Sequence, residues 1–347
     1  MGKEINEVVN RYKSVSIFGA GSSGFTAYEY LTNSSIKVDN FYDNDQSKHN
    51  TIFCECEVLN PELILQKKPL IVIASTWENQ IVEQLKNMNY ENYTFIDILG
   101  FEEEYKIWKK NRVASDLNLE FFQKNSKNLS KWTLPKLIKN SNEIWAKELV
   151  KIYERDISFP ASLSPAAGEL YRSLLLNIAP KTIVEIGIFM GVSTIWAASA
   201  LKDLEIDAKI YSIDLFNNKR IDENHFEYVK NIIKSAEISD IVELFQLNSY
   251  IDFEKFLPNL SNKKIDFLFI DGDHTPRGAT LDFLKFNDYL AIGGYIMLHD
   301  IFPEYCGWEG PAFIIDQYIK HNSENFELCQ IYTTPNNYGL ALIRKIK

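Results

Sequence analysis

Two apolar stretches that end in acidic and imidazole side chains constrain the fold of this chain more than any other feature. The first is Asp266-Phe-Leu-Phe-Ile-Asp271-Gly-Asp273-His274, and the second is Gly294-Tyr-Ile-Met-Leu-His299-Asp300. Continuous apolar runs of this length are typical of parallel strands that are buried on both faces. Because the carboxyl ends of parallel strands meet at one edge of a sheet, Asp271 and Asp300 are expected to lie within reach of one hard cation.

A third apolar run leads into a glycine-containing turn. The segment Thr182-Ile-Val-Glu185-Ile-Gly187 reads as a strand, and the chain then turns at Gly187 and Gly191 and continues as a helix. Such a turn lets a ligand approach the backbone N–H groups at a helix N-terminus. Asp214 ends the next expected strand, where a carboxylate can accept hydrogen bonds from a ribose diol. Together these features predict an adenosine site.

The remaining C-terminal pattern predicts a doubly wound sheet. We expect central parallel strands over 183–186, 265–270 and 294–298, and an amphipathic helix over 282–290. Residues 327–344 read as two strands around a turn at Asn336 and Asn337. The predicted fold class is α/β, with two doubly wound Rossmann-like domains joined by a helical segment. The C-terminal domain is expected to have seven strands and to end in an antiparallel hairpin.

These motifs resemble the class I S-adenosylmethionine-dependent methyltransferases, and more narrowly the metal-dependent O-methyltransferases of the catechol and caffeoyl-CoA type. The resemblance covers roughly 162–347. It implies that S-adenosylmethionine is the cofactor, that the glycine turn holds its methionine part, that Asp214 holds its ribose, and that the segment after the strand 242–247 contacts its adenine. The cofactor-binding residues implied are Glu185, Gly187, Gly191, Ser193, Asp214, Asn248, Ser249 and Asp271.

The same resemblance implies a metal site and a catalytic base. Asp271 and Asp300 match the two metal carboxylates, and His274 falls where the family carries its base, which is usually lysine. Ile301 departs from the pattern, since the family often has a metal-binding asparagine there. A related bacterial group that modifies sugars and antibiotics has a polar residue before the second aspartate, where His299 stands. Oxygen ligands suit Mg²⁺, although both aspartates could instead cap helices.

The N-terminal region contains a second glycine pattern. Gly19, Gly21 and Gly24 fit Gly-x-Gly-x-x-Gly between a strand and a helix, and Asp43 ends a second strand near the spacing expected for ribose binding. With strands over 70–75 and 93–97, the pattern predicts a small Rossmann-like domain. It resembles the nucleotide-binding modules of sugar-modifying enzymes from surface-polysaccharide pathways. The domain either holds a nucleotide or nucleotide sugar, or keeps the fold for packing alone.

Three regions follow from these patterns. We expect a nucleotide-binding domain over 1–100, a helical connector or lid over 101–160, and a methyltransferase domain over 161–347. Tryptophans at 108, 132 and 145 give the connector enough apolar surface to pack. Ser164 is the expected cap of a helix that runs through Leu176.

Composition limits the partners of the chain. A net charge of −10 without a basic cluster argues against nucleic acid, and 347 residues with 46% hydrophobic content suffice for two cores. No apolar run is long enough to span a bilayer and no signal-peptide pattern is present, so we expect a cytoplasmic protein. Four cysteines without metal-site spacing are expected to be reduced structural thiols.

The sequence therefore predicts an O-methyltransferase that acts on a hydroxylated small molecule, such as a sugar, a polyol or a nucleotide-linked sugar. Two alternatives stay open: an NAD-dependent oxidoreductase whose chemistry lies in the N-terminal domain, and a non-catalytic nucleotide-sensing or scaffold protein. The sequence does not determine the acceptor or the oligomeric state, and a homo-oligomer is one option.

Overall fold

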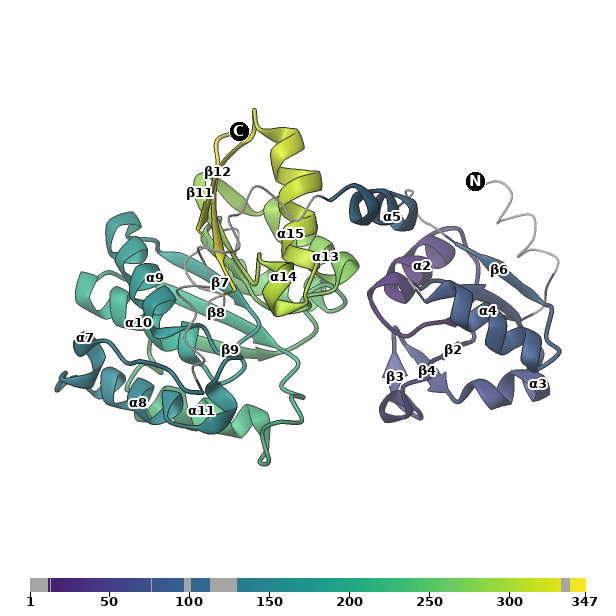
Figure 1. Ribbon diagram of the computed structural model, residues 1–347, viewed down its shortest axis with the longest axis horizontal. Helices are drawn as coiled ribbons and strands as arrows, with labels where there is room; N and C mark the ends of the chain where they lie inside the picture. The colour runs from purple at the N-terminus through teal and green to yellow at the C-terminus, as the bar shows by residue number, and fades with distance from the viewer. Residues whose placement is uncertain are drawn as a thin grey trace. The chain divides into compact units, whose positions relative to one another are not determined.

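The computed structural model divides the chain into two compact units, Met1–Arg112 and Val113–Lys347 (Figure 1). Each unit contains its own sheet of mainly parallel strands flanked by helices, which confirms the expected mixed α/β class. The structure describes residues 12, 14–75, 77–96, 101–112, 130–261, 263–331 and 338–347.

The N-terminal unit is built on a six-stranded sheet with the order β3-β4-β2-β1-β5-β6. All neighbouring strands pair in parallel except β3, which runs antiparallel to β4 at one edge. The strands are β1 Val15–Phe18, β2 Asn40–Tyr42, β3 Ile52–Phe53, β4 Cys56–Leu59, β5 Leu70–Ile73 and β6 Tyr93–Phe95. The strand order reverses between β1 and β5, where a doubly wound sheet binds its ligand.

Helices cover both faces of this sheet because successive strand residues point to opposite sides. Ile17 packs with Leu31 of α2 on one face, whereas Phe18 packs with Leu85 of α4 on the other. The helices of this unit are α2 Ser22–Asn33, α3 Ile64–Lys67, α4 Glu78–Asn87 and α5 Phe101–Asn111.

The C-terminal unit is built on a seven-stranded sheet with the order β12-β13-β11-β10-β7-β8-β9. Strands β7 to β11 pair in parallel, and β13 runs antiparallel to both β11 and β12. The strands are β7 Thr182–Ile186, β8 Lys209–Asp214, β9 Val242–Gln246, β10 Ile265–Ile270, β11 Leu290–His299, β12 Phe326–Ile331 and β13 Leu340–Lys345. The turn expected at Asn336 and Asn337 lies outside the described residues.

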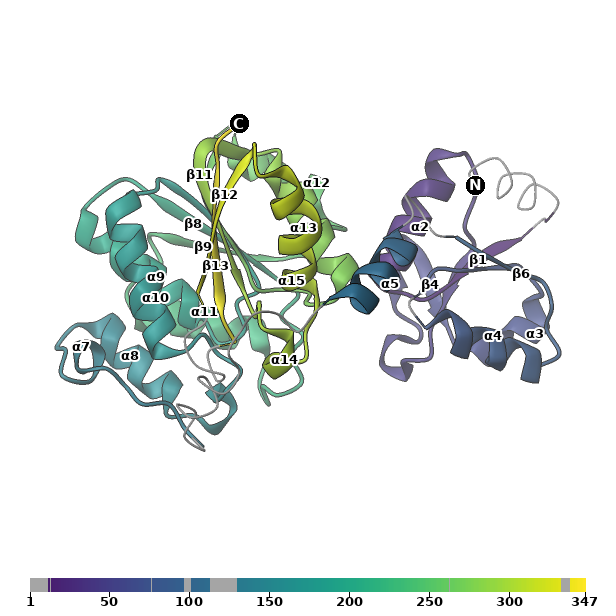
Figure 2. The same ribbon diagram turned by 45° about the horizontal axis from the view of Figure 1, so that its top comes forward.

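Two helical layers bury the faces of the C-terminal sheet (Figure 2). Phe267 and Phe269 of β10 face α8 to α11, while Leu268 and Ile270 face α13 and α15. The continuous apolar run of β10 is thus explained by burial on both sides. The helices are α7 Lys136–Lys139, α8 Ile144–Tyr153, α9 Pro165–Ile178, α10 Val192–Leu204, α11 His225–Ser235, α12 Phe253–Phe256, α13 Pro276–Asn287, α14 Pro303–Cys306 and α15 Gly310–Ile314.

One of two expected helices has different bounds in the structure, and the expected cap of the other is confirmed. The helix expected over 282–290 in fact spans Pro276–Asn287, because the Thr275 hydroxyl accepts from the Gly278 N–H and proline occupies the first helical position. Leu290 already belongs to β11. The Ser164 cap is confirmed, since its side chain accepts from the Ala167 N–H, and helix α9 continues to Ile178.

The segment expected as a connector contributes helices to both units. Trp108 is buried on α5 of the N-terminal unit. Trp145 is buried on α8 and lies 5.9 Å from Trp196 of α10, measured between ring centroids. Residues 113–129 lie outside the described part.

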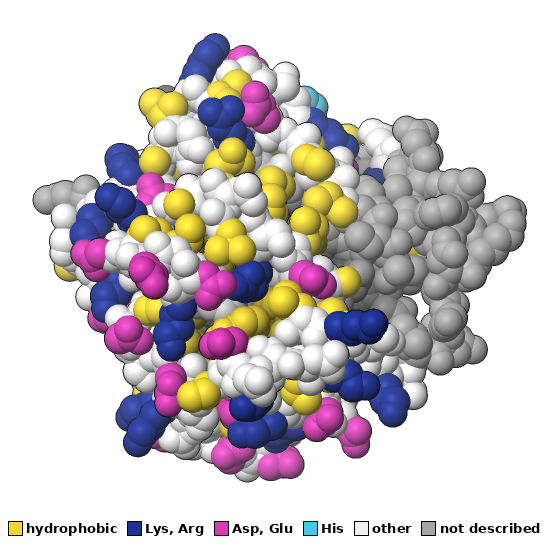
Figure 3. Space-filling view, turned by 90° about the vertical axis from the view of Figure 1, so that its left-hand side faces the viewer, with side chains coloured by type: hydrophobic (Ala, Val, Ile, Leu, Met, Phe, Trp, Pro, Cys, Tyr) yellow, Lys and Arg dark blue, Asp and Glu magenta, His cyan; other side chains and the backbone are white. Residues whose placement is uncertain are grey.

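The described surface is mixed in charge where Figure 3 shows it, because Lys and Arg side chains alternate with Asp and Glu side chains on that face. No basic patch dominates this view, in line with the overall net charge of −10. Among the helices that the structure describes, none has the length and apolar character needed to cross a membrane.

Candidate active site

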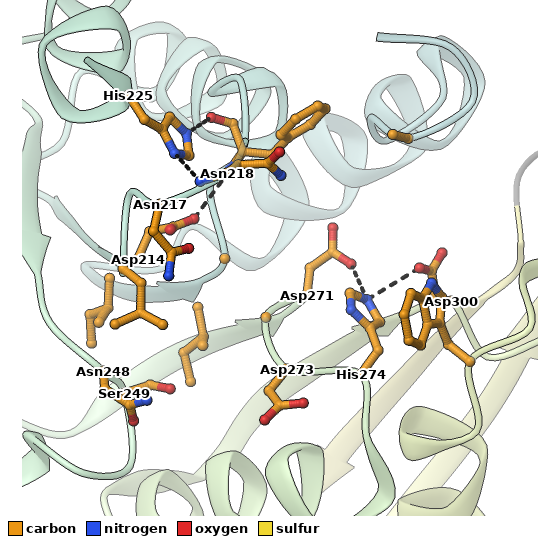
Figure 4. A pocket seen from close by; sticks show the side chains of 18 of the residues that line it. Asp214, Asn217, Asn218, His225, Asn248, Ser249, Asp271, Asp273, His274 and Asp300 are labelled. Atoms are coloured by element: carbon orange, nitrogen blue, oxygen red, sulfur yellow. Dashed lines mark hydrogen bonds and ion pairs between the residues drawn. The ribbon is translucent and has the colours of Figure 1, made fainter. Parts of the chain in front are cut away.

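A cavity of about 630 Å³ opens at the carboxyl ends of the parallel strands in the C-terminal unit. Residues that follow all five parallel strands, β7 to β11, line it, so that positions far apart in the sequence face one space. Figure 4 shows Asp214, Asn248 and Ser249 on one side and Asp271, His274 and Asp300 on the other. The two motifs that the sequence indicated separately therefore share one cavity.

Gly187 forms the turn after β7 and lines the cavity. Its φ of +86° is a conformation that residues with a side chain rarely adopt. A Cβ placed at this position would lie 2.2 Å from the carbonyl oxygen of Asp271, which is far inside contact distance. The Asp271 N–H donates to the Ile186 carbonyl at 2.8 Å. The glycine thus allows the turn to lie directly against the end of β10.

Asp214 at the end of β8 braces this turn. One carboxylate oxygen, Oδ2, accepts from the N–H groups of Ile188 at 2.8 Å and Phe189 at 3.3 Å. The other, Oδ1, accepts from the Phe216 N–H at 2.7 Å. Asp214 still lines the cavity, and Oδ1, which accepts only one of these hydrogen bonds, keeps a lone pair for a further donor such as a hydroxyl.

The loop after β9 forms the wall next to Asp214. Asn248 orders this loop, because its Oδ1 accepts from the N–H groups of Tyr250 at 3.2 Å and Ile251 at 2.9 Å. The Ser249 hydroxyl donates to Oδ1 of Asp282 on α13 at 2.5 Å. Asn248 and Ser249 both line the cavity, whereas Asp282 is fully buried behind them.

Two aspartates and two histidines meet at the other side of the cavity. His274 Nε2 lies 3.1 Å from Asp271 Oδ1 and 3.2 Å from Asp300 Oδ2. His299 Nδ1 lies 3.1 Å from the same Asp271 oxygen and 3.2 Å from Asp300 Oδ1. Each imidazole therefore bridges both carboxylates, and the cluster comes from the ends of only two strands, β10 and β11.

Charge pairing controls the ionisation of this cluster. Burial by itself would raise the pKa of Asp271, but the neighbouring His299 and His274 outweigh it and lower the pKa to about 2. Burial would lower the pKa of His274, but hydrogen bonds to Asp271 and Asp300 raise it to about 10. Burial likewise opposes the charged form of His299, and the charges of Asp271 and Asp300 still raise its pKa to about 9. The lowered pKa of Asp271 and the raised pKa values of His274 and His299 thus favour a carboxylate between two imidazolium groups.

Neither aspartate caps a helix, although the sequence allowed that alternative. Thr275 caps α13, and Phe302 stands at the cap position of α14 without a side-chain hydrogen bond. Asp300 instead has a φ of +57°, which is uncommon for a residue with a side chain. Such a conformation costs on the order of 1–3 kcal/mol and is characteristic of functional sites.

The donor set fits a divalent cation. One ligand atom from each of Asp271, His274 and Asp300 lies within 4.8 Å of the other two. His299 faces the same carboxylates through Nδ1, and its buried Nε2 has no hydrogen-bond partner among the described residues. Carboxylate oxygens suit Mg²⁺, and imidazole nitrogens extend the possible ions to Mn²⁺, Fe²⁺ and Zn²⁺.

Three residues that the sequence indicated for cofactor binding lie behind the cavity wall. Glu185 is almost completely buried, and its Oε2 accepts from the hydroxyls of Thr194 and Ser212, each at 2.7 Å. Gly191 caps α10 with a φ of +79°, and Ser193 is buried in the first turn of that helix. None of the three lines the cavity in the described structure, so they support the turn that Gly187 presents.

The N-terminal glycine pattern is also in place. Gly19 has a φ of +114°, and a Cβ at Gly24 would lie 1.9 Å from the Gly19 carbonyl oxygen, so both glycines serve close packing of α2. Gly21 precedes α2 and has open space around it. Asp43 Oδ2 accepts from the Ala20 N–H at 2.8 Å and the Lys48 ammonium at 2.9 Å. Its Oδ1 accepts from the Asp45 N–H at 2.8 Å.

Two further residues belong to the site without having been indicated by sequence. Trp308 lines the cavity with 51% of its surface exposed, and its ring centroid lies 5.7 Å from that of His274. His225 of α11 also lines the cavity, with Nε2 2.6 Å from the Phe189 carbonyl oxygen. Trp308 lies between Gly307 and Gly310, and this glycine-flanked aromatic just after a strand-end aspartate was the available signal.

Comparison with protein families matches two parts of the chain. Residues 184–301 match a family described as a methyltransferase domain, and this range contains every cavity residue from Ile186 to Asp300. Residues 11–96 match a family described as C2185-like, N-terminal.

Two curated relatives match part of the chain. Tricin synthase 2 of Oryza sativa subsp. japonica is 32% identical over 114 residues, which are 32% of this chain and 36% of the relative. A caffeoyl-CoA O-methyltransferase of Stellaria longipes is 28% identical over 130 residues, which are 37% of this chain and 50% of the relative. The C-terminal unit is therefore similar to a methyltransferase domain over 184–301 and, in part, to a caffeoyl-CoA O-methyltransferase. The chain spans half or less of the length of these two relatives.

Among solved structures, an O-methyltransferase from Bacillus cereus in complex with S-adenosylhomocysteine superposes on the chain with a TM-score of 0.44. It is 19% identical, and the match covers 57% of this chain and 90% of that protein.

Proposed function

We propose that this protein transfers the methyl group of S-adenosylmethionine to a hydroxyl group of a small molecule. The observation that supports this most strongly is the single cavity of about 630 Å³, which joins the Gly187 turn and Asp214 to the cluster of Asp271, His274 and Asp300. A nucleoside-binding half and a half that can activate an oxygen lie next to each other, as methyl transfer between two bound substrates requires.

In this proposal the cofactor lies along the nucleoside-binding half. The Gly187 turn contacts its methionine part, Asp214 accepts hydrogen bonds from the ribose, and Asn248 and Ser249 meet the adenine. Glu185, Gly191 and Ser193 act from behind the wall, because they hold the turn and the start of α10 in place. Asp271 lies at the junction of the two halves, directly against Gly187.

Asp271 and Asp300 would hold a divalent cation, with His299 as a further ligand, and Mg²⁺ is our first choice. When bound, such an ion acts as a Lewis acid that lowers the pKa of a nearby hydroxyl group. His274 is the proposed base that takes the proton of the acceptor. His274 can do so only as a neutral imidazole. The proposal therefore requires that the bound cation take the place of the His274 imidazolium as the positive partner of the two carboxylates.

The reaction is a direct displacement. The acceptor oxygen loses its proton to His274 and forms a bond to the methyl carbon, while the bond between that carbon and the sulfonium sulfur breaks. S-adenosylhomocysteine is the leaving group and takes the electron pair. The protein contributes mainly by holding the two substrates in line, which can supply a large part of the barrier reduction.

We propose a sugar, a polyol or a nucleotide-linked sugar as the acceptor. The half-exposed indole of Trp308 beside His274 supports this, because an aromatic face packs well against the C–H face of a sugar ring. In the N-terminal unit, Gly19, Gly21, Gly24 and Asp43 would place a nucleotide or nucleotide sugar at the reversal of strand order between β1 and β5. The proposed regions are 1–100 for nucleotide binding, 101–160 for a helical connector and 161–347 for methyl transfer.

A labelling screen tests the proposal. The protein is incubated with S-adenosylmethionine carrying an isotope-labelled methyl group and a panel of sugars, polyols and nucleotide sugars, and the products are analysed by mass spectrometry. We expect a labelled methyl ether that forms only with added Mg²⁺ or Mn²⁺. If calorimetry detects no binding of S-adenosylmethionine or S-adenosylhomocysteine, the proposal is wrong.

Three variants separate the roles at the site. Asp300→Ala should remove Mn²⁺ binding, measured by electron paramagnetic resonance, while the affinity for S-adenosylhomocysteine stays nearly unchanged. His274→Ala should lower kcat by roughly 10²–10⁴-fold, the usual contribution of a positioned base. Asp240→Ala removes an exposed carboxylate outside the cavity and should behave like the unaltered protein. Full activity in excess chelator would contradict the metal part of the proposal.

A further inference from the structure

Arg220 is a positively charged side chain that the proposed reaction does not use. It lies on the loop after β8 and lines the cavity. Four aspartates also line it, Asp214, Asp271, Asp273 and Asp300, and Arg220 is the only lysine or arginine among the described residues of the lining. Carboxylates repel an anion. Outside the proposed cation site, Arg220 is therefore the point of the lining where an anionic part of a ligand is favoured.

Two contacts hold the guanidinium group of Arg220 in place. Its central carbon lies 4.8 Å from the centroid of the Phe189 ring, which is within the range of a cation–π interaction. Its Nε donates to Asn218 Oδ1 at 3.4 Å, and the same oxygen accepts from the Arg220 backbone N–H at 3.0 Å. The side chain is therefore oriented before a ligand arrives, which reduces the entropy cost of binding.

His225 joins the two segments on which Arg220 rests. Phe189 follows β7, and Asn218 follows β8. His225 Nδ1 accepts from the Asn218 N–H at 3.3 Å, so Nε2 carries the proton and donates to the Phe189 carbonyl oxygen at 2.6 Å. Only 5% of His225 is exposed, and this neutral imidazole fixes both segments without adding a charge.

Arg220 keeps most of its donors for a ligand. A guanidinium group has five N–H donors, and only the one on Nε is used. Neither terminal nitrogen makes a hydrogen bond or an ion pair with a residue that the structure describes. The residue is also exposed, so it lies at the opening of the cavity. Two parallel N–H groups of this kind match the two oxygens of a carboxylate or a phosphate.

We infer that Arg220 binds an anionic group of the acceptor, so that the molecule that is methylated carries a phosphate or a carboxylate group. The anion lies at the opening of the cavity beside Phe189, while the hydroxyl group to be methylated lies at Asp271 and Asp300. Sugar phosphates, nucleotide-linked sugars and sugar acids fit this arrangement, whereas neutral sugars and polyols do not. This inference rests on the proposed methyl transfer and narrows the class of its acceptor.

The test measures the binding of three probes to the full chain by calorimetry: glucose, glucuronate and glucose 1-phosphate. S-adenosylhomocysteine is present at saturation, together with Mg²⁺. We expect at least one of the two charged probes to bind more tightly than glucose by about tenfold or more, the ratio that corresponds to one hydrogen bond to a charged group. Arg220→Gln should reduce this ratio to about twofold or less, because it removes the charge and the paired donors.

Lys219→Gln is the matched control, because Lys219 is the neighbouring exposed cation and does not line the cavity. It should keep the full preference for the charged probes, and both variants should bind S-adenosylhomocysteine like the unaltered protein. Equal affinity for all three probes, an unchanged preference in Arg220→Gln, or an equal loss in Lys219→Gln would overturn the inference.

The affinity for S-adenosylhomocysteine separates two further outcomes. If Arg220→Gln alone binds it about tenfold more weakly, the inference is also overturned, since Arg220 then serves the carboxylate of the cofactor. Absence of S-adenosylhomocysteine binding to the unaltered protein would instead overturn the proposed function.

Discussion

Replacement of Gly187 by alanine should break the cavity at the junction of its two halves. The new Cβ would lie 2.2 Å from the Asp271 carbonyl oxygen and 2.8 Å from the Gly272 nitrogen, and both are backbone atoms that cannot turn away. The φ of +86° adds a conformational cost of about 1–2 kcal/mol for any residue with a side chain. Relief of the overlap requires backbone shifts that cost about 1–3 kcal/mol more.

Gly293 is a matched control for this substitution. It has the same φ of +86°, but no atom lies within 4 Å of a Cβ built there. Gly293→Ala should therefore show only the conformational cost of about 1–2 kcal/mol, whereas Gly187→Ala should lose roughly 2–5 kcal/mol of unfolding free energy.

Two measurements on each variant separate these effects. Urea denaturation gives the loss of unfolding free energy, and calorimetry gives the affinity for S-adenosylhomocysteine. We expect Gly187→Ala to lose most cofactor binding and Gly293→Ala to keep it. Equal destabilisation of the two variants, together with normal cofactor binding by Gly187→Ala, would refute the close approach of the turn to the end of β10.

Three further predictions concern the support of the two units. Glu185→Ala leaves two buried hydroxyls without their acceptor and should cost roughly 2–5 kcal/mol in urea denaturation; a cost below that of Glu185→Gln would contradict this role. Ser164→Ala removes the cap of α9 and should cost about 1 kcal/mol, measured in the same way against Ser164→Asn, which should be nearly neutral. Gly24→Ala places a Cβ 1.9 Å from a backbone oxygen and should lower the melting temperature of the N-terminal unit in calorimetry, while Gly21→Ala has open space and should not; similar melting temperatures would show that Gly24 is not needed for packing.

The residues behind the cavity wall make contacts that could not be predicted from the sequence. The family resemblance implies that Glu185 contacts the cofactor, and this stays a prediction; in the structure its side chain accepts hydrogen bonds from Thr194 of α10 and Ser212 of β8. Which face of β7 is covered by which helix depends on contacts with distant segments, and the alternation along the strand does not reveal it. Trp308, by contrast, lines the cavity although the sequence did not indicate it. A backbone hydrogen bond from the Gly310 N–H to the His274 carbonyl brings the Trp308 loop to His274.

The sequence alone determined the class of fold and the end of the sheet at which the chemistry gathers. Apolar runs that finish in Gly187, Asp214, Asp271 and Asp300 require parallel strands buried on both faces, and the ends of such strands meet at one edge.

Only the tertiary structure decided which polar groups face the cavity and which support it from behind. Asp282 gave no sign of its pairing with Ser249, since 33 positions separate them and the contact forms only when α13 packs behind the loop after β9. Side-chain contacts of this kind depend on helix placement and strand register, which are set by the whole core and not by any local pattern.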